Sequence, residues 1–381
     1  MTETRIFKPR QGPREYVFAL AAEEGTDLEH ALAELEARYA ALCEEAGIDA
    51  GSALFRRIFL SDAQNQAQRV GHSALARPRS SGGPCAVSLV EQPPAFGAKL
   101  ALFAYHLEPD GASSREALAD GVAMHRHGLT HIWVGGLCVG AERNPVPVRP
   151  QTRAVFSRLK DILSPYQATL RDHCVRTWIY VRDVDLFYAE MVAERREIFA
   201  EEGLTPDTHF IASTGIGGAC SHRYDLVAMD SYAIAGLRPE QVRYLNDFSR
   251  LNAPKAYGVS FERATEIRYA DRRHVFLSGT ASIDRDGNVV HPGDVEAQLS
   301  RALDNAAGLL AAGGARLDDL LYLLVYLRDP ADAIRIERRL EQVLPGVPRI
   351  LLHAPVCRPQ WLVEIEGVAA VEAEETGLPQ F

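Results

Sequence analysis

The chain of 381 residues lacks the patterns that mark several classes of protein. No apolar run approaches the roughly 18 residues that a membrane helix needs, and the first residues lack the apolar core of a signal peptide. The six cysteines show no CxxC spacing and fall mostly in apolar segments, which favours buried thiols over disulfides or a zinc ribbon. The sequence therefore predicts a soluble cytoplasmic protein that does not contact membranes.

Motifs for nucleotides and for common catalytic groups are also missing. There is no Gly-rich phosphate loop and no Ser-His-Asp pattern, and the run Gly215-Ile216-Gly217-Gly218 is not the dinucleotide fingerprint. The net charge of −10 argues against nucleic acid as a partner, since phosphate binding needs a basic face. We expect no cofactor and no metal. An anionic substrate would need a local cluster of arginines.

What the chain does contain is a repeated pattern of strand-like and helix-like segments. The matching pairs are 131–137 with 274–280, 178–183 with 324–329, and 226–230 with 362–366. A weaker first copy, at 55–62 and 100–105, shows only the second half of the pattern. The copies lie more than about a hundred residues apart, so each is a whole domain rather than a solenoid unit.

The repeat predicts three α+β units with mixed β-sheets and helices packed on one face. We place the units at residues 1–112, 113–240 and 241–381, and expect the third to carry the active site. The hydrophobic fraction of 47% is ample for three buried cores.

Glu364 is the first candidate for chemistry. It stands between two apolar residues with Glu366 two places on, so strand alternation puts both carboxylates on one face. A solvent-facing edge strand is the plain alternative. However, the repeat places Ala101 and Ala228 at the position of Glu364, which indicates a close environment of small residues. Burial without a cationic partner raises a carboxyl pKa and yields a proton donor near neutrality.

Arg349 is a candidate for binding a substrate carboxylate, because its guanidinium can donate two parallel charged hydrogen bonds. The repeat places Ser213 and Ala86 at its position, so only the third copy has both this arginine and Glu364. A surface arginine after a proline turn is the alternative reading.

Arg263 and Arg328 are candidates for a second carboxylate. Arg328 has a counterpart in Arg182, which suits a structural role equally well. Cys357 has no evident histidine base or helix N-terminus nearby, so we expect a pocket wall or core position rather than a nucleophile.

The third copy resembles the RidA/YjgF family, the small trimeric imine deaminases. The resemblance covers about residues 253–372 and rests on Ala256-Tyr257-Gly258, Phe276-Leu277-Ser278-Gly279, Pro348-Arg349 and Val363-Glu364-Ile365-Glu366. Thr280 stands where that family has glutamine. The resemblance implies a RidA/YjgF-like, chorismate-mutase-like fold with sites between adjacent units.

The whole chain is more similar to the chorismatases, which are RidA-like units fused in one polypeptide. The segments are Cys85–Pro94, Tyr257–Arg263, Ser278–Ser282 and Cys357–Pro359 ahead of Glu364. By this resemblance Glu364 is the catalytic acid, and the products are pyruvate with either 3-hydroxybenzoate or a dihydroxycyclohexadiene carboxylate. Cys357 with the small Gly279 resembles the branch that makes 3-hydroxybenzoate.

We therefore predict an enzyme that cleaves chorismate to pyruvate and 3-hydroxybenzoate, with Glu364 protonating the methylene carbon. A chorismate hydrolase, a RidA-type enamine/imine deaminase and a non-catalytic binder of small aromatic acids remain the alternatives. The expected substrate-binding residues are Arg349, Arg328, Arg263, Tyr257, Gly279, Thr280 and Cys357. Three units that satisfy one another's interfaces predict a monomer with an internal pseudo-trimer.

Overall fold

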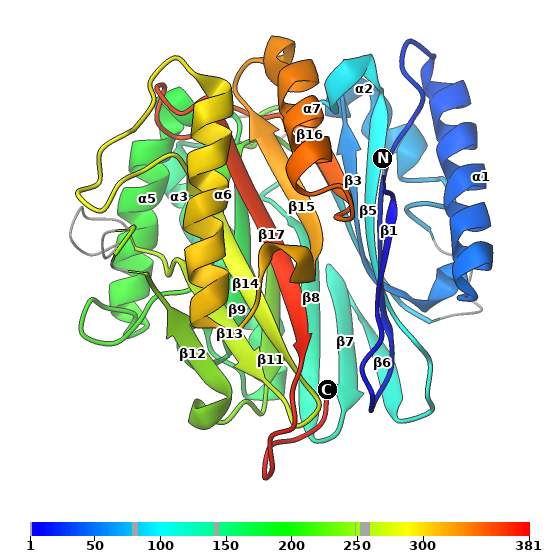
Figure 1. Cartoon of the computed structure of the whole chain (residues 1–381), viewed down its shortest axis with the longest axis vertical. Coiled ribbons are helices and arrows are strands. Elements are labelled where there is room, and N and C mark those ends of the chain that lie inside the picture. The colour runs from blue at the N-terminus through cyan, green and yellow to red at the C-terminus, as the bar shows by residue number, and fades with distance from the viewer. Residues whose placement is uncertain (1, 78–82, 141–144, 248, 252–259) are drawn as a thin grey trace.

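The computed structural model describes residues 2–77, 83–140, 145–247, 249–251 and 260–381. Three mixed β-sheets lie inside the molecule and the long helices lie outside them (Figure 1). Each sheet uses one consecutive stretch of chain, which is the α+β architecture that the repeat predicts.

Each sheet has its own order of strands in space. The first sheet contains, from one edge to the other, β1 (Thr4–Phe7), β2 (Glu15–Ala21), β5 (Leu100–Leu107), β3 (Ala53–Leu60) and β4 (Ala86–Glu91). The second contains β10 (Ala212–Gly217), β9 (Cys174–Val181), β11 (Val227–Ala235), β8 (Leu129–Leu137), β7 (Gly121–Arg126) and β6 (Ser113–Leu118). The third contains β12 (Val242–Leu245), β13 (Ala264–Arg268), β14 (Arg272–Ala281), β17 (Val363–Glu372), β15 (Leu320–Leu327) and β16 (Arg349–His353).

Aspartate caps begin most of the helices. The helices are α1 (Leu28–Ala46), α2 (Ala63–Val70), α3 (Val148–Leu163), α4 (Leu170–His173), α5 (Val184–Glu201), α6 (Val295–Ala312) and α7 (Ala333–Val343). The side chains of Asp27, Asp62, Asp183 and Asp294 accept a hydrogen bond from the backbone N–H three residues on, at α1, α2, α5 and α6. Such a cap stabilises a helix by about 1 kcal/mol.

The first copy is complete, which corrects the expectation that it keeps only its second half. β2 occupies the place that β8 and β14 hold in the other sheets, and α1 follows it as α3 and α6 follow theirs. The sequence comparison missed this half because burial in a strand constrains the polarity of residues more than their identity.

Sheet registers verify which residues of the three copies are equivalent. One aromatic residue in each sheet pairs with the residue at the position of Glu364: Phe59 with Ala101, Tyr180 with Ala228, and Tyr326 with Glu364. On their other edge the same aromatics pair with Val90, Ile216 and Leu352. Counting back from these, the first-copy equivalent of Arg349 is Val87 and not Ala86.

The sheets contact one another in a cycle. β4 lies against β8, β10 against β14, and β16 against β2. A buried ion pair crosses each interface: Arg57 with Asp230 at 2.7 Å, Arg176 with Glu366 at 2.7 Å, and Arg272 with Glu15 at 2.6 Å. Because an unpaired charge in such a place is costly, these pairs define how the sheets dock.

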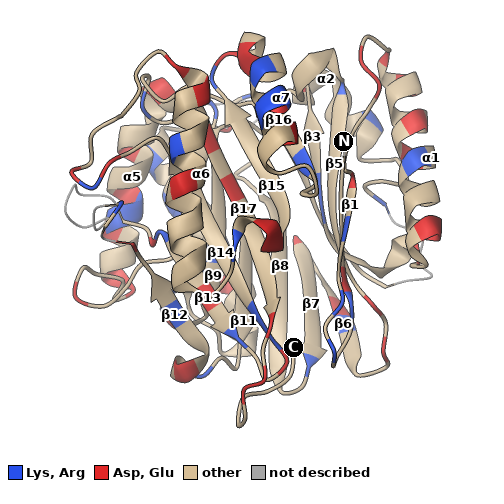
Figure 2. Cartoon of the chain, in the orientation of Figure 1, with Lys and Arg blue, Asp and Glu red and all other residues tan. Residues whose placement is uncertain are grey.

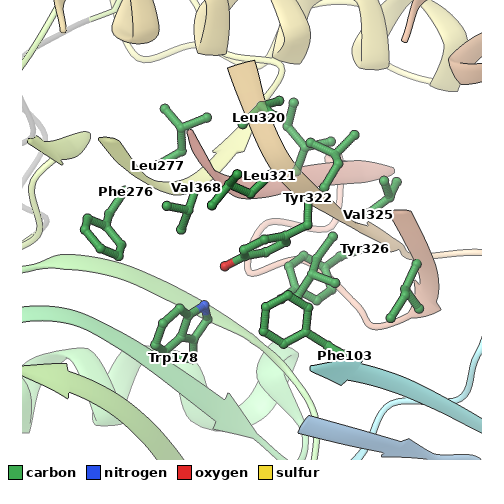
Figure 3. Packing of buried hydrophobic residues seen from close by; sticks show 14 of the residues in the cluster. Phe103, Trp178, Phe276, Leu277, Leu320, Leu321, Tyr322, Val325, Tyr326 and Val368 are labelled. Carbon is green, nitrogen blue, oxygen red and sulfur yellow. The ribbon is translucent and has the colours of Figure 1, made fainter. Parts of the chain in front are cut away.

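Aromatic side chains from all three sheets fill the centre (Figure 3). Phe103 and Tyr322 have ring centroids 4.5 Å apart, although they come from the first and third sheets. Trp178 brings the second sheet to the same core. Charged residues lie mainly on the outer helices and loops, while the strands are mostly uncharged (Figure 2). Among the described residues, no helix is long and apolar enough to cross a membrane.

Candidate active site

A cavity of about 250 Å³ lies where the second sheet meets the third. Its lining residues come from α5, β10, β14, β17, the segment after β14 and the segments that precede β13 and β17. They are Tyr188, Arg195, Ser213, Thr214, Gly215, Phe261, Arg263, Gly279, Ala281, Ile283, Cys357, Arg358, Trp361 and Glu364. The cavity therefore gathers groups from parts of the chain that are far apart in sequence.

Glu364 reaches the cavity from β17. It pairs with Ala281 on β14 and with Tyr326 on β15, and it is only 5% exposed. Gly279 makes room for it, since a Cβ at that position would lie 2.9 Å from the carboxyl carbon of Glu364. Within the described part of the chain, no hydrogen bond to the Glu364 carboxyl group is found.

The surroundings of Glu364 raise its pKa to about 8. Burial is the main cause, and repulsion by Glu366 adds to it, while Arg176 and Arg263 act in the opposite direction. Desolvation disfavours the charged form of a carboxyl group. Glu364 is thus protonated at neutral pH and can donate its proton to a bound molecule.

Glu366 shares the face of β17 with Glu364, as strand alternation requires, but it has a different environment. Arg176 donates to it at 2.7 Å, the indole N–H of Trp178 donates at 2.7 Å, and Thr214 also donates. The two neighbouring carboxyl groups therefore differ in their contacts: Glu364 faces the cavity, whereas Glu366 accepts hydrogen bonds from three side chains within the interface.

Arg195 and Arg263 bring positive charge to the cavity. Arg195, from α5, is 1% exposed, and its Nε donates to Ser260 at 3.3 Å. Its second terminal nitrogen has no hydrogen-bond partner within the described residues. Arg263 is 5% exposed, and its charge acts on Glu364. Arg358 also lines the cavity but is less buried than these two. The two buried guanidinium groups suit an anionic ligand with two carboxylates, and they disfavour a metal ion.

Cys357 forms part of the wall, beside Tyr188. Burial, followed by the charge of Glu364, raises the pKa of this thiol to about 12. A thiol in this state is a poor nucleophile because the thiolate is the reactive form. This agrees with the sequence-based expectation of a wall position.

The predicted site residues thus fall into two groups. Glu364, Arg263, Gly279 and Cys357 meet at the cavity, whereas Arg349, Arg328 and Thr280 do not line it. Tyr257 lies outside the described residues. The Thr280 hydroxyl donates to the Ser278 carbonyl at 2.9 Å and is buried in β14.

Arg349 is used elsewhere, which revises the expectation that it binds substrate. Its Nε donates to the two carboxylate oxygens of Glu337 at 3.1 and 3.0 Å, a terminal nitrogen also donates to Glu337, and the other donates to the Leu344 carbonyl at 3.3 Å. The guanidinium is buried and committed to α7. Spacing along the sequence could not reveal this partner, because helix α7 meets β16 only through tertiary packing.

Arg328 makes a structural contact instead of lining the cavity. Its two terminal nitrogens donate to the two carboxylate oxygens of Asp185 on α5 at 2.9 Å each, and one also donates to the Val356 carbonyl. Arg328 therefore joins the second and third sheets next to Cys357. This is the structural alternative that its counterpart Arg182 suggested.

The sequence reading missed Arg195. A signal was present, since Arg195 stands four residues after Met191 and three before Ile198, both buried in α5. An arginine on the apolar face of an amphipathic helix needs a partner or a ligand.

Comparisons with known proteins agree on one family. A family model described as endoribonuclease L-PSP matches residues 253–371. A chorismatase from Streptomyces rapamycinicus is 31% identical over 243 residues, covering 58% of this chain and 70% of the relative. A 3-hydroxybenzoate synthase from Streptomyces hygroscopicus is 28% identical over 271 residues, covering 64% and 76%.

Two further matches are also to chorismatases. A chorismatase from Streptomyces hygroscopicus is 30% identical over 215 residues, covering 51% of this chain and 61% of the relative, which is less than two thirds of its length. A chorismatase crystal structure covers 94% of this chain and 99% of its own, with a TM-score of 0.63 and 20% identity, and confirms the fold of fused RidA-like units. The chain therefore belongs to the chorismatase family.

Proposed function

We propose that this protein cleaves the enolpyruvyl ether of chorismate, and that Glu364 donates the proton that starts the reaction. The observation that carries the proposal is a buried carboxyl group with a pKa of about 8, facing a cavity that also contains Arg195 and Arg263. The family membership supports the same substrate.

Cleavage begins at the enol ether. A proton from the Glu364 carboxyl group adds to the methylene carbon, which becomes a methyl group, and the neighbouring carbon becomes an oxocarbenium ion. The carboxylate left behind is the counter-ion of that cation. A positioned acid contributes about 10²–10⁴-fold to such a step, and a site that excludes water prevents the proton from being lost to solvent.

The two arginines supply the orientation. Chorismate carries one carboxylate on its ring and another on its enolpyruvyl group, and each can receive charged hydrogen bonds from a guanidinium. Because Arg195 comes from α5 of the second copy and Arg263 from the stretch leading into the third sheet, the substrate would bridge them. Holding both ends places the methylene carbon at the acid.

The fate of the cation determines the product, and we propose that it is 3-hydroxybenzoate. Pyruvate and 3-hydroxybenzoate together contain the atoms of chorismate with no water added, whereas the diene diol requires one water molecule. The cavity wall near Glu364 is formed by Cys357, Ala281 and the backbone of Gly279. Apart from the Glu364 carboxylate, which is the counter-ion of the cation, this part of the wall offers no base to activate a water molecule. The synthase named among the relatives supports this choice.

The test is to incubate the purified chain with chorismate in deuterium oxide and identify the products by mass spectrometry. We expect 3-hydroxybenzoate and pyruvate with a single deuteron in its methyl group, since the Glu364 proton exchanges with solvent. A diene diol would assign the hydrolase reaction instead. Intact chorismate with folded protein would refute the proposal, and 2-aminoacrylate turnover in the same preparation would favour a deaminase.

We further propose that the chain acts as a monomer, because the cyclic contacts of its three sheets are made within one polypeptide. The support is that all three interfaces, with their ion pairs, are intramolecular. Light scattering that shows a stable trimer of full-length chains would contradict it.

A further inference from the structure

A second cluster of reactive side chains lies in the second sheet, away from the cavity. Cys138 follows β8, and Cys220 and Asp225 lie in the loop between β10 and β11. One ligand atom from each residue lies within 4.8 Å of the other two. Cys220 and Asp225 are buried, while Cys138 is partly exposed, so an ion can reach the cluster from the side of Cys138.

The spacing suits a tetrahedral metal ion. Zinc binds thiolate sulfur at about 2.3 Å and carboxylate oxygen at about 2.0 Å, so a sulfur and an oxygen on one zinc are about 3.5 Å apart. In the structure the Cys220 thiol donates a hydrogen bond to the Asp225 carboxylate, with sulfur and oxygen 3.4 Å apart, so a zinc ion that replaces the thiol proton would need little movement of either side chain. Two thiolates and a carboxylate form a donor set for zinc rather than for the hard cations Mg²⁺ and Ca²⁺.

The backbone around the cluster is held in place. The N–H of Gly140 donates to the Asp225 carboxylate at 2.8 Å and thereby orients it. Arg182 donates to the backbone carbonyls of Asp225, Cys220 and His222 at 2.8, 3.1 and 3.0 Å. Such outer contacts orient metal ligands. The positive charge of Arg182 also offsets the net negative charge that two thiolates, a carboxylate and Zn²⁺ would leave.

The repeat explains why the cluster stands there. The loop between β10 and β11 has the length of the loop between β16 and β17, and each is held by a glutamine from the first long helix of its copy, α3 or α6. Gln151 accepts from the Leu226 N–H at 2.7 Å, and Gln298 accepts from the Leu362 N–H at 2.8 Å.

Because the two loops have the same length and are held in the same way, their residues can be matched position by position. In the third copy the loop brings Trp361 to the cavity, opposite Ala281. In the second copy the positions equivalent to Trp361 and Ala281 are Asp225 and Cys138. The same scaffold thus presents an acid-bearing cavity in one copy and a group of metal-ligating side chains in another.

We propose that Cys138, Cys220 and Asp225 bind one zinc ion, with a water molecule completing the coordination. The ion ties the segment after β8 to the loop before β11 and stabilises the second copy. None of the three ligands lines the cavity that contains Glu364, so we assign the ion a structural role and no part in ether cleavage.

The test is zinc content and affinity of the full chain purified under reducing conditions, measured by elemental mass spectrometry and by competition with a chromophoric chelator. We expect one zinc per chain, and at least about a tenfold loss of affinity in Cys220→Ser and in Asp225→Asn. Cys43→Ala, a buried cysteine of α1, should bind zinc like the wild type.

A second readout guards against misfolding of the variants. Cobalt in place of zinc should show the strong sulfur-to-metal absorption of two thiolates in the wild-type chain, and a chelator should lower its melting temperature. If the wild-type chain binds zinc no more tightly than a Cys138→Ser/Cys220→Ser double variant, the proposal is wrong. So would a Cys138–Cys220 disulfide found in protein alkylated at lysis.

Discussion

Replacing Glu364 with glutamine removes the acid while keeping the size of the side chain and its place on β17. A glutamine amide cannot donate a proton to carbon, so the loss of rate should equal the contribution of the general acid. We expect kcat to fall by about 10²–10⁴-fold. Binding should change little, because Arg195 and Arg263 are untouched.

The pKa of about 8 determines how the wild-type rate depends on pH. At pH 7 the acid form outnumbers the ionised form by about ten to one, and at pH 9 the ratio is reversed. The value of kcat/KM should therefore be flat near neutrality and fall about tenfold per pH unit above pH 8. The residual rate of Glu364→Gln should lack this decline.

The same substitution should also change stability. The folded-state pKa of Glu364 is raised above the ordinary value of 4.5, so between about pH 4.5 and 8 the folded state holds a proton that the unfolded state has lost. The free energy of unfolding therefore declines as pH rises through this range, by up to about 5 kcal/mol. Glu364→Gln should not share this decline and should gain stability over the wild type as pH rises to 8.

Steady-state release of pyruvate, followed from pH 6 to 10, and urea unfolding at pH 5 and pH 8 measure these quantities. Glu341→Gln, an exposed glutamate of α7, is the control and should behave as the wild type in both. A Glu364→Gln variant that retains a tenth of the wild-type kcat, or whose stability follows the wild type at both pH values, would refute the reasoning.

Three further substitutions separate binding, geometry and folding. Arg195→Gln should lower kcat/KM by about 10–100-fold through a higher KM, since a charged hydrogen bond is worth about 1.5–3 kcal/mol. Arg196→Gln, which changes the exposed neighbour, should leave KM unchanged. Equal KM values for Arg195→Gln and the wild type would contradict a binding role. Gly279→Ala should lower kcat by displacing the acid and cost about 1–3 kcal/mol of stability, and an unchanged kcat would exclude the close packing of Gly279 against Glu364. Arg349→Met should cost about 3–5 kcal/mol of stability, because it leaves the buried carboxylate of Glu337 unpaired, and the KM of the folded fraction should be unchanged. A large rise in KM would show that Arg349 binds the substrate after all.

Patterns within single segments proved sufficient for much of the fold. The matching segments 131–137 with 274–280 and 226–230 with 362–366 read as strands, and the structure has them in β8, β14, β11 and β17. The internal repeat predicted that Ala101 and Ala228 are the equivalents of Glu364, and the sheet registers agree. These features follow from local backbone geometry, which the sequence specifies one element at a time.

The partners of charged side chains could not be read in this way. Arg349 precedes an apolar strand segment and Arg195 lies on the apolar face of α5, yet one is paired with Glu337 and the other faces the cavity. The difference depends on which helix packs beside each strand.

For this protein, then, the sequence by itself determined the repetition of the second and third copies and the place of Glu364 on its strand, because strand alternation acts along one segment. Only the tertiary structure decided which groups meet at the cavity and around Cys138, because those groups come from different units or from distant loops of one unit. Their proximity results from the packing of the sheets and the loops between them, and no spacing along the chain records that packing.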